Sequence, residues 1–347
     1  MTNLTIDKTF MMDFMVGLLN IPSPTGDTDA AIAYCEQALN GWPLKVHRTP
    51  KGQMVATWEG AKNDRPRAMT AHVDTLGAMV KEIKSNGRLK LTHLGGLNWS
   101  SIECEGVTVR TLDGKDIPGS VMPVKASSHV HGKEASEITR SADTLEVRLD
   151  VQVSSAAEVE TLGIQVGDFV YIDPRVVVHN GYIRARFLDD KACVACMMAA
   201  IKAVLDARLI PTQRITFHFS NYEEVGHGGA SGFPDDIVEL VTVDMAAVGE
   251  GQTSDEFNVT ICAKDTGGPY HLGFRKQLVG LAKQLGIPYK IDIYPNYGSD
   301  GEALWRAGAD VAVGLVGPGI DGSHSYERTH ETSLIQTAHL LAAYIVS

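Results

Sequence analysis

The sequence has no long hydrophobic run and no surplus of basic residues. Its longest apolar stretches are interrupted by charged residues or glycine well before bilayer length, and the first residues lack a basic stretch followed by an apolar one. The 31 basic residues stand against 42 acidic ones, a formal net charge of −11, which argues against a nucleic-acid surface. We therefore expect a cytoplasmic protein that binds neither membranes nor nucleic acids.

Cysteine is also scarce. The five cysteines are an odd number without the spacing of a secreted disulfide framework, which is typical of a reducing compartment. Cys193 and Cys196 fall in a predicted helix rich in Ala and Met, and no second pair exists to complete a zinc knuckle. We interpret both as small buried residues and give a redox role little weight.

The length of 347 residues favours two domains, or one domain with a large insertion. Between residues 78 and 178, short alternating segments are separated by Gly, Asp and Pro, which predicts an inserted small β domain. The flanking parts, 1–77 and 179–347, alternate helical and extended patterns and predict one α/β catalytic domain. The expected helices are 10–20, 27–40, 190–207, 271–285, 300–307 and 333–345, and the expected strands include 44–48, 54–58, 67–72, 214–219, 237–244, 257–262, 289–293 and 311–316.

Two adjacent carboxylates, Glu223 and Glu224, follow the predicted strand 214–219. Because neighbouring side chains leave the backbone in different directions, one carboxylate can face a metal ion and the other a water molecule. A solvated loop pair is the alternative interpretation. The tight Gly-rich turn 225–230 that follows is unlike a charged surface loop, so we favour a catalytic pair in a hydrolase.

Further ligand candidates follow other β-like runs: His72 and Asp74 after the run 67–70, Asp244 after the run 237–243, and His324 in a Gly-rich loop after 311–316. An open α/β sheet brings such groups together at the carboxyl edge of its strands. A mixed set of His and carboxylate ligands suits Zn²⁺ or a similar divalent ion in a catalytic site.

Several positions remain open from the sequence alone. Asp74 lies two residues after His72, so it shares that face of the strand and can orient the imidazole, although a simple hydrogen bond at a strand end would leave the same pattern. In the pair Asp189 and Asp190, one residue can cap the following helix while the other bridges two metal ions.

Three histidines near the candidate site are also ambiguous. His324 and His330 are both candidates for the last ligand position, and the sequence around them favours each about equally. His227 stays open because its loop follows the acidic pair.

Together these motifs resemble the M42 family of dinuclear metallo-aminopeptidases over nearly the whole chain. About 115 residues separate Asp74 from Asp189, which fits a family that carries its small domain at this point, unlike the related M20 and M28 peptidases. The matching motifs are His72-x-Asp74, Asp189-Asp190-Lys191, Glu223-Glu224-Val225-Gly226, Asp244, Gly298-Ser299-Asp300-Gly301 and His324.

The resemblance implies an α/β/α sandwich of the zinc-exopeptidase type with an inserted β-barrel-like domain. It also implies two divalent ions per subunit, most often Zn²⁺ with Co²⁺ or Mn²⁺ as alternatives, and a homo-oligomer that acts on short peptides, often a dodecamer. In that pattern Asp189 bridges the ions, Glu223 is the general base and Asp74 supports catalysis. His72 and Asp244 hold one ion while Glu224 and His324 hold the other, and the pattern favours His324 over His330.

Some segments depart from the family pattern. Thr75-Leu76 and His227-Gly228 replace the pairs that are more usual in the family. These differences leave the metal ligands intact, but they leave the substrate preference open. The ending Tyr326 to His330 looks like that of a subgroup associated with a bacterial osmoprotectant, N-acetylglutaminylglutamine amide. A deacylase or amidase that acts on an N-blocked small molecule or osmolyte dipeptide, with the same metals and no anchor for a free amine, is an alternative function. A non-catalytic scaffold is less favoured because every expected ligand is present.

Overall fold

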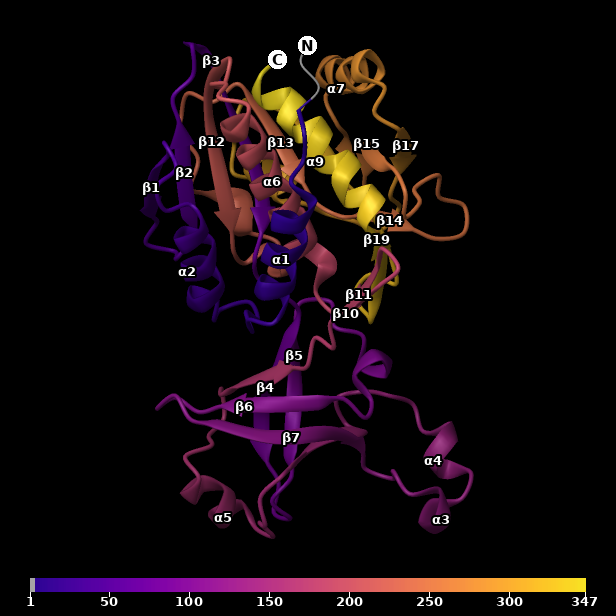
Figure 1. Ribbon diagram of the computed structural model, residues 1–347. Coiled ribbons are helices and arrows are strands. Elements are labelled where there is room, and N and C mark those ends of the chain that lie inside the picture. The colour runs from indigo at the N-terminus through magenta and orange to yellow at the C-terminus, as the bar shows by residue number, and fades with distance from the viewer. Residues whose placement is uncertain (1–3) are drawn as a thin grey trace.

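A mixed β-sheet with a parallel centre organises the larger part of the chain in the computed structural model, which describes residues 4–347 (Figure 1). Four central strands run parallel in the order β12 (Gln213–Ser220), β3 (Lys62–His72), β13 (Glu239–Val243) and β18 (Ala312–Asp321). Because they are parallel, their carboxyl ends meet at one edge of the sheet.

Antiparallel strands extend the sheet on both sides. β2 (Met54–Trp58) and β1 (Lys45–Arg48) continue it beyond β12. On the other side β18 is followed by β19 (Glu327–His330), β11 (Tyr182–Ala185) and β10 (Val177–His179). A branch from β18 holds β14 (Ala246–Val248), β15 (Val259–Asp265), β16 (Gly268–Pro269) and β17 (Tyr289–Ile293).

Helices cover both faces of the sheet because its central strands are apolar on both sides. Met69 and Val241 point into the larger core, whereas their neighbours Ala68 and Leu240 point into a smaller core on the opposite face. The larger core includes α1 (Lys8–Leu19), α2 (Asp29–Ala38), α6 (Leu188–Asp206), α7 (Leu272–Leu285) and α9 (Glu331–Ile345), and the smaller one includes α8 (Asp300–Arg306). The predicted α/β/α sandwich is confirmed.

A closed six-stranded barrel follows β3 and lies at the end of the molecule opposite the chain termini (Figure 1). Its strands pair in the order β4 (Gly77–Ile83), β5 (Leu89–Leu94), β8 (Leu145–Leu149), β7 (Asp116–Pro123), β6 (Gly106–Arg110) and β9 (Phe169–Ile172). Short helices η1 (Trp99–Ile102), α3 (Ser128–His131), α4 (Glu134–Glu137) and α5 (Ala156–Thr161) lie between the strands. The barrel has a separate apolar core, and the predicted inserted segment, 78–178, encloses nearly all of it.

The Ala- and Met-rich sequence that contains Cys193 and Cys196 forms helix α6. It packs against β3, α1 and α9, and Cys193 and Cys196 are fully buried with free thiols. The middle of α6, from Ala192 to Ile201, is fully buried and apolar, as expected for a helix segment enclosed by other elements. Among residues 4–347, no helix combines the length and the apolar character needed to cross a bilayer.

Candidate metal centre

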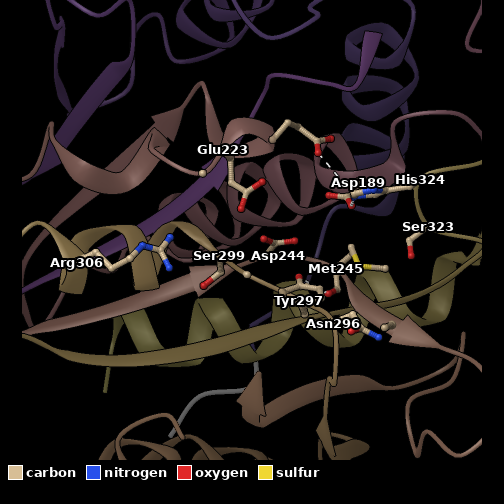
Figure 2. Close-up of a pocket in the computed structure, with 14 residues that line it drawn as sticks. Asp189, Glu223, Asp244, Met245, Asn296, Tyr297, Ser299, Arg306, Ser323 and His324 are labelled. Atoms are coloured by element: carbon tan, nitrogen blue, oxygen red, sulfur yellow. Dashed lines mark hydrogen bonds and ion pairs between the residues drawn. The ribbon is translucent and has the colours of Figure 1, made fainter. Parts of the chain in front are cut away.

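The carboxyl ends of the central strands bring the predicted ligands together (Figure 2). His72 is the last residue of β3, and Asp244 directly follows β13. Glu223 and Glu224 open the short helix η2 (Glu223–Val225), three residues after β12 ends. Residues separated by more than a hundred positions therefore meet at one sheet edge, where α6 contributes Asp189 from its first turn.

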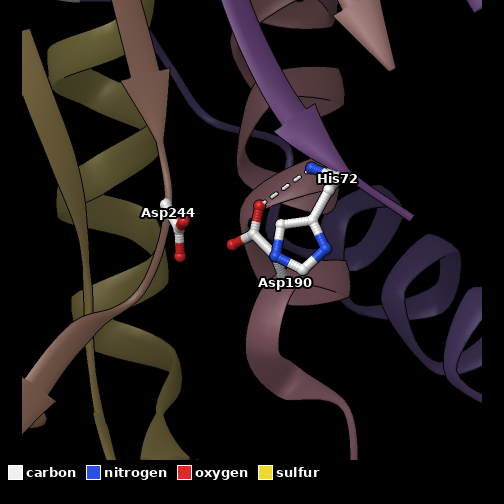
Figure 3. Close-up of side chains that lie close together, drawn as sticks. All are labelled: His72, Asp190 and Asp244. Carbon is white, nitrogen blue, oxygen red and sulfur yellow. Dashed lines mark hydrogen bonds between the residues drawn. The ribbon is translucent and has the colours of Figure 1, made fainter. Parts of the chain in front are cut away.

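Two groups of side chains have a composition suited to metal ions. The ligand atoms of His72, Asp190 and Asp244 lie within 4.8 Å of one another (Figure 3), and so do those of Asp189, Glu224 and His324. The groups adjoin at Asp189, whose Oδ1 lies 3.3 Å from Nε2 of His72 while Oδ2 lies 3.7 Å from Nε2 of His324. One carboxylate thus faces both groups.

Asp190 is a candidate that our sequence assignment left out. Its side chain is fully buried, Oδ2 accepts a hydrogen bond from the backbone N–H of His72 at 3.1 Å, and Oδ1 has no hydrogen-bond partner. The peptide bond between Asp189 and Asp190 is cis. The sequence showed two adjacent carboxylates but not that both would face the site.

Asp74 orients His72 mainly through its backbone. Nδ1 of His72 lies 2.9 Å from the carbonyl oxygen of Asp74 and 3.4 Å from its carboxylate Oδ1. Because a carbonyl only accepts hydrogen bonds, Nδ1 carries a proton and Nε2 is the ring atom that faces the carboxylates and is placed to bind a metal ion. The Asp74 carboxylate accepts the backbone N–H groups of Glu223 and Glu224, at 3.2 and 3.3 Å. Asp74 therefore supports both His72 and the acidic pair.

The three ambiguous histidines have different surroundings. His324 lies beside Asp189 and Glu224, with Nε2 3.7 Å from Oε2 of the latter. His330 instead precedes α9 as its N-cap, where Nδ1 accepts the backbone N–H of Thr332. His227 stacks on the ring of Tyr222, with ring centroids 5.2 Å apart. The structure brings only His324 of the three to the two groups.

The electrostatics of the site reflect a surplus of carboxylates. Burial raises the pKa of Glu223 and Glu224 well above the ordinary range and that of Asp244 to about 7, and nearby carboxylates add to these shifts. Burial alone would lower the pKa of His72, but the adjacent carboxylates of Asp189 and Asp74 raise it well above its usual value. Nε2 of His72 is also buried without a hydrogen-bond partner. Divalent cations would balance this charge and occupy these donors, so the residues fit metal ions.

A cavity of about 490 Å³ opens beside the two groups (Figure 2). Glu223 and Asp244 line it on the side of the candidate centre, and Asn296, Tyr297 and Arg306 line it elsewhere. Its volume lies within the range of small-molecule sites.

Comparison with known proteins assigns the family. The family model described as M42 glutamyl aminopeptidase matches residues 52–340. The chain belongs to the M42 family. This M42 peptidase is 47% identical over 337 residues to a protein of Bacillus subtilis (strain 168) named putative aminopeptidase YhfE, and the match covers 97% of each chain. The family and this relative place the protein among the aminopeptidases, a class of hydrolases.

Solved structures share the fold of this M42 peptidase. The aminopeptidase APDkam598 from the archaeon Desulfurococcus kamchatkensis superposes with a TM-score of 0.87 at 21% identity, covering 97% of this chain and 95% of the other. The TET1 peptidase of Pyrococcus horikoshii, described as able to assemble into a tetrahedron or a large octahedral shell, gives a TM-score of 0.84 at 22% identity, with 97% and 99% covered.

Glu327 has a structural role at the centre that sequence reasoning missed. It is buried in the M42 peptidase, and its Oε2 accepts the backbone N–H of Asp189 at 3.1 Å while Oε1 accepts that of His324 at 3.2 Å. The sequence placed Glu327 close to His324, but nothing in it indicated a contact with Asp189, 138 positions away.

Proposed function

We propose that this M42 peptidase is a dinuclear metal-dependent aminopeptidase that removes N-terminal residues from short peptides. The main support is the position of Asp189, whose two carboxylate oxygens face His72 on one side and His324 on the other. A carboxylate that faces two ligand groups suits a bridging role between two cations.

The proposed ligands divide between the two groups. His72 and Asp244 would hold one cation, Glu224 and His324 the other, and Asp189 both. Asp190 offers a further oxygen in the first group. Zn²⁺ suits these ligands, and Co²⁺ and Mn²⁺ accept the same donor types.

Glu223 is the proposed general base. Its carboxylate lines the cavity, with Oε2 3.6 Å from Nε2 of His72, and its backbone is fixed by Asp74. When bound, the cations would polarise the scissile carbonyl and lower the pKa of a water molecule. Glu223 accepts the proton of that water as the carbonyl is attacked and then donates it to the leaving amine.

Self-association and location complete the proposal. A structural neighbour, the TET1 peptidase, can assemble into a tetrahedron or a large octahedral shell, and we propose that this chain also forms a homo-oligomer, with a dodecamer as the specific form. Exposed apolar side chains are available for contacts between subunits: Val177 and Val178 of β10, and Ile291 and Ile293 of β17.

We assign residues 78–178 to a separate domain that contributes to assembly and substrate access. We assign the peptidase to the cytoplasm. Membership of the osmoprotectant-associated subgroup stays a prediction.

Metal stoichiometry tests the dinuclear proposal. Chain stripped with a chelator is titrated with Zn²⁺, Co²⁺ and Mn²⁺ by calorimetry while hydrolysis of an aminoacyl anilide is followed. We expect two cations per chain, with activity that depends on them. Saturation at one cation, or full activity in stripped chain, would refute the dinuclear centre.

A further inference from the structure

Arg306 is the only Arg or Lys among the residues that line the cavity beside the candidate metal centre. It lies at the end of α8, and its side chain is 58% exposed. Figure 2 shows it across the cavity from His324, with its guanidinium directed toward Ser299 and Glu223. The other charged residues of the cavity include four carboxylates, Asp189, Glu223, Glu224 and Asp244. A guanidinium among them can bind a negatively charged group of a substrate.

The guanidinium is held from one side. Nη1 of Arg306 donates to Oε2 of Glu302, one helical turn earlier, at 3.0 Å. Glu302 is itself fixed, because its side chain is only 6% exposed and Oε1 accepts the backbone N–H of Gly267 at 2.7 Å. An ordinary surface pair between residues four apart has two mobile partners, whereas here the carboxylate is buried and anchored.

This arrangement positions Arg306 without using all of its donors. Arginine presents five N–H groups in a planar fork, and Glu302 accepts from Nη1 alone. The remaining donors are available on the cavity side. Such a fork matches the two oxygens of a carboxylate better than the single charge of a lysine does.

We propose that Arg306 binds a carboxylate group of the substrate. This inference rests on the proposed aminopeptidase function and adds a substrate class to it. Short peptides offer that group in two places: the C-terminal carboxylate of a dipeptide or tripeptide, and the side chain of an acidic residue. The cations of the proposed centre offset the carboxylates of the cavity wall, and Arg306 supplies the positive site for the substrate's own negative charge.

Matched substrate pairs test this assignment. Each pair differs only in one carboxylate: a dipeptide and its C-terminal amide, a peptide amide beginning with Glu and one beginning with Gln, and a peptide amide with Glu or Gln in second place. The wild-type chain is compared with Arg306→Gln, Arg306→Lys and the control Arg275→Gln, which changes an arginine of α7 outside the cavity lining. Circular dichroism and thermal unfolding verify that each variant folds.

We expect the ratio of kcat/KM for carboxylate and uncharged substrates to fall in at least one pair by about 10-fold or more in Arg306→Gln, mainly through KM, because the variant loses a charge-assisted hydrogen bond to the substrate. The ratio for Arg306→Lys should lie between those of the wild type and Arg306→Gln, and the ratio for Arg275→Gln should match that of the wild type. The pair that responds identifies which carboxylate is bound. Unchanged ratios in all three pairs, with uncharged substrates still cleaved, would overturn the proposed role of Arg306 and leave the aminopeptidase proposal in place. Absence of any hydrolysis by the metal-loaded wild type would overturn the aminopeptidase proposal and this inference with it.

Discussion

Nδ1 of His324 lies 3.2 Å from the carbonyl oxygen of Gly96, a residue 228 positions away in the loop that follows β5 of the barrel. A carbonyl can only accept, so Nδ1 carries the proton and Nε2 is left to face Asp189 and Glu224. Partners of this kind fix the tautomer and the ring orientation of metal-binding histidines. The barrel thus supports the candidate centre through the backbone of the loop after β5.

Replacing Gly96 with alanine should weaken the half of the centre that contains His324. A Cβ at this position would lie 2.7 Å from Nδ1 of His324, so the ring must move. We expect about 10- to 100-fold weaker binding of one of the two cations, the usual effect of losing such a partner, measured by competition with a chelator.

Gly280→Ala is the matched control for this change. Gly280 lies in α7, and a Cβ there would meet nothing within 4 Å. Its metal binding should equal that of the wild type. Equal affinities in Gly96→Ala and Gly280→Ala would show that the barrel loop does not position His324.

Asp74 and Glu327 have parallel roles, and isosteric changes should reveal them. Each carboxylate accepts two backbone N–H groups: those of Glu223 and Glu224 for Asp74, and those of Asp189 and His324 for Glu327. In Asp74→Asn or Glu327→Gln an NH₂ group replaces one acceptor. An unpaired buried N–H costs about 1–3 kcal/mol, so urea unfolding of metal-loaded chain, in which bound cations balance the surplus of carboxylates, should show a loss of that size in each variant. A loss below 0.5 kcal/mol in both would contradict this role.

The sequence predicted most of the α/β part, because its helices and strands are long and have a clear period. Strand 67–72 and helix 271–285, for example, were expected within a few residues of β3 and α7 apart from the exposed start of β3. In the barrel, β4, β5 and β7 were not identified individually, and in β7 Pro118 and Gly119 interrupt the alternating pattern.

Most ligand candidates could be found from the sequence because they lie at or shortly after the ends of strands, where chain direction determines position, whereas Asp189 was found from the acidic pair at the start of α6. Their supporting groups could not. The carbonyl of Gly96 has no side-chain signature, and Glu327 reaches Asp189 only through the folded arrangement of β19 and α6. Arg306 is likewise an ordinary helix residue in sequence, and its place in the cavity depends on how α8 packs on the sheet.

Acid should destabilise the protein partly through His218, which is buried in β12. Burial lowers the pKa of His218 to about 3, with a smaller contribution from Lys51. The unfolded chain therefore takes up this proton first, so the stabilising effect is complete above pH 6.5 and is lost as the pH falls toward 3. Between pH 8 and about pH 5.5, His218 should account for about 1.4 kcal/mol of lost stability.

The contribution of His218 can be isolated by difference. His218→Gln keeps a polar partner for Thr70, whose hydroxyl lies 2.9 Å from Nδ1 of His218. Its unfolding free energy should fall less steeply with acid than that of the wild type, whereas His129→Gln, on the exposed helix α3, should follow the wild type. Parallel curves for all three proteins would show that His218 is not the buried neutral group described.

Glu223→Gln should separate metal binding from turnover. Glutamine has nearly the same shape but does not act as a base, so kcat should fall by at least about 10²- to 10⁴-fold. Calorimetry should still show two bound cations, because Glu223 is not among the proposed ligands. Substantial remaining activity would remove Glu223 from the base role, and loss of a cation would make it a ligand instead.

The most direct test is hydrolysis of paired aminoacyl and N-acetyl-aminoacyl substrates by metal-loaded protein, with a chelator-treated sample and Glu223→Gln as controls. The proposed function predicts cleavage of the free-amine substrates alone, abolished by the chelator and by the substitution. Cleavage of only the acetylated substrates would contradict it and would establish a deacylase.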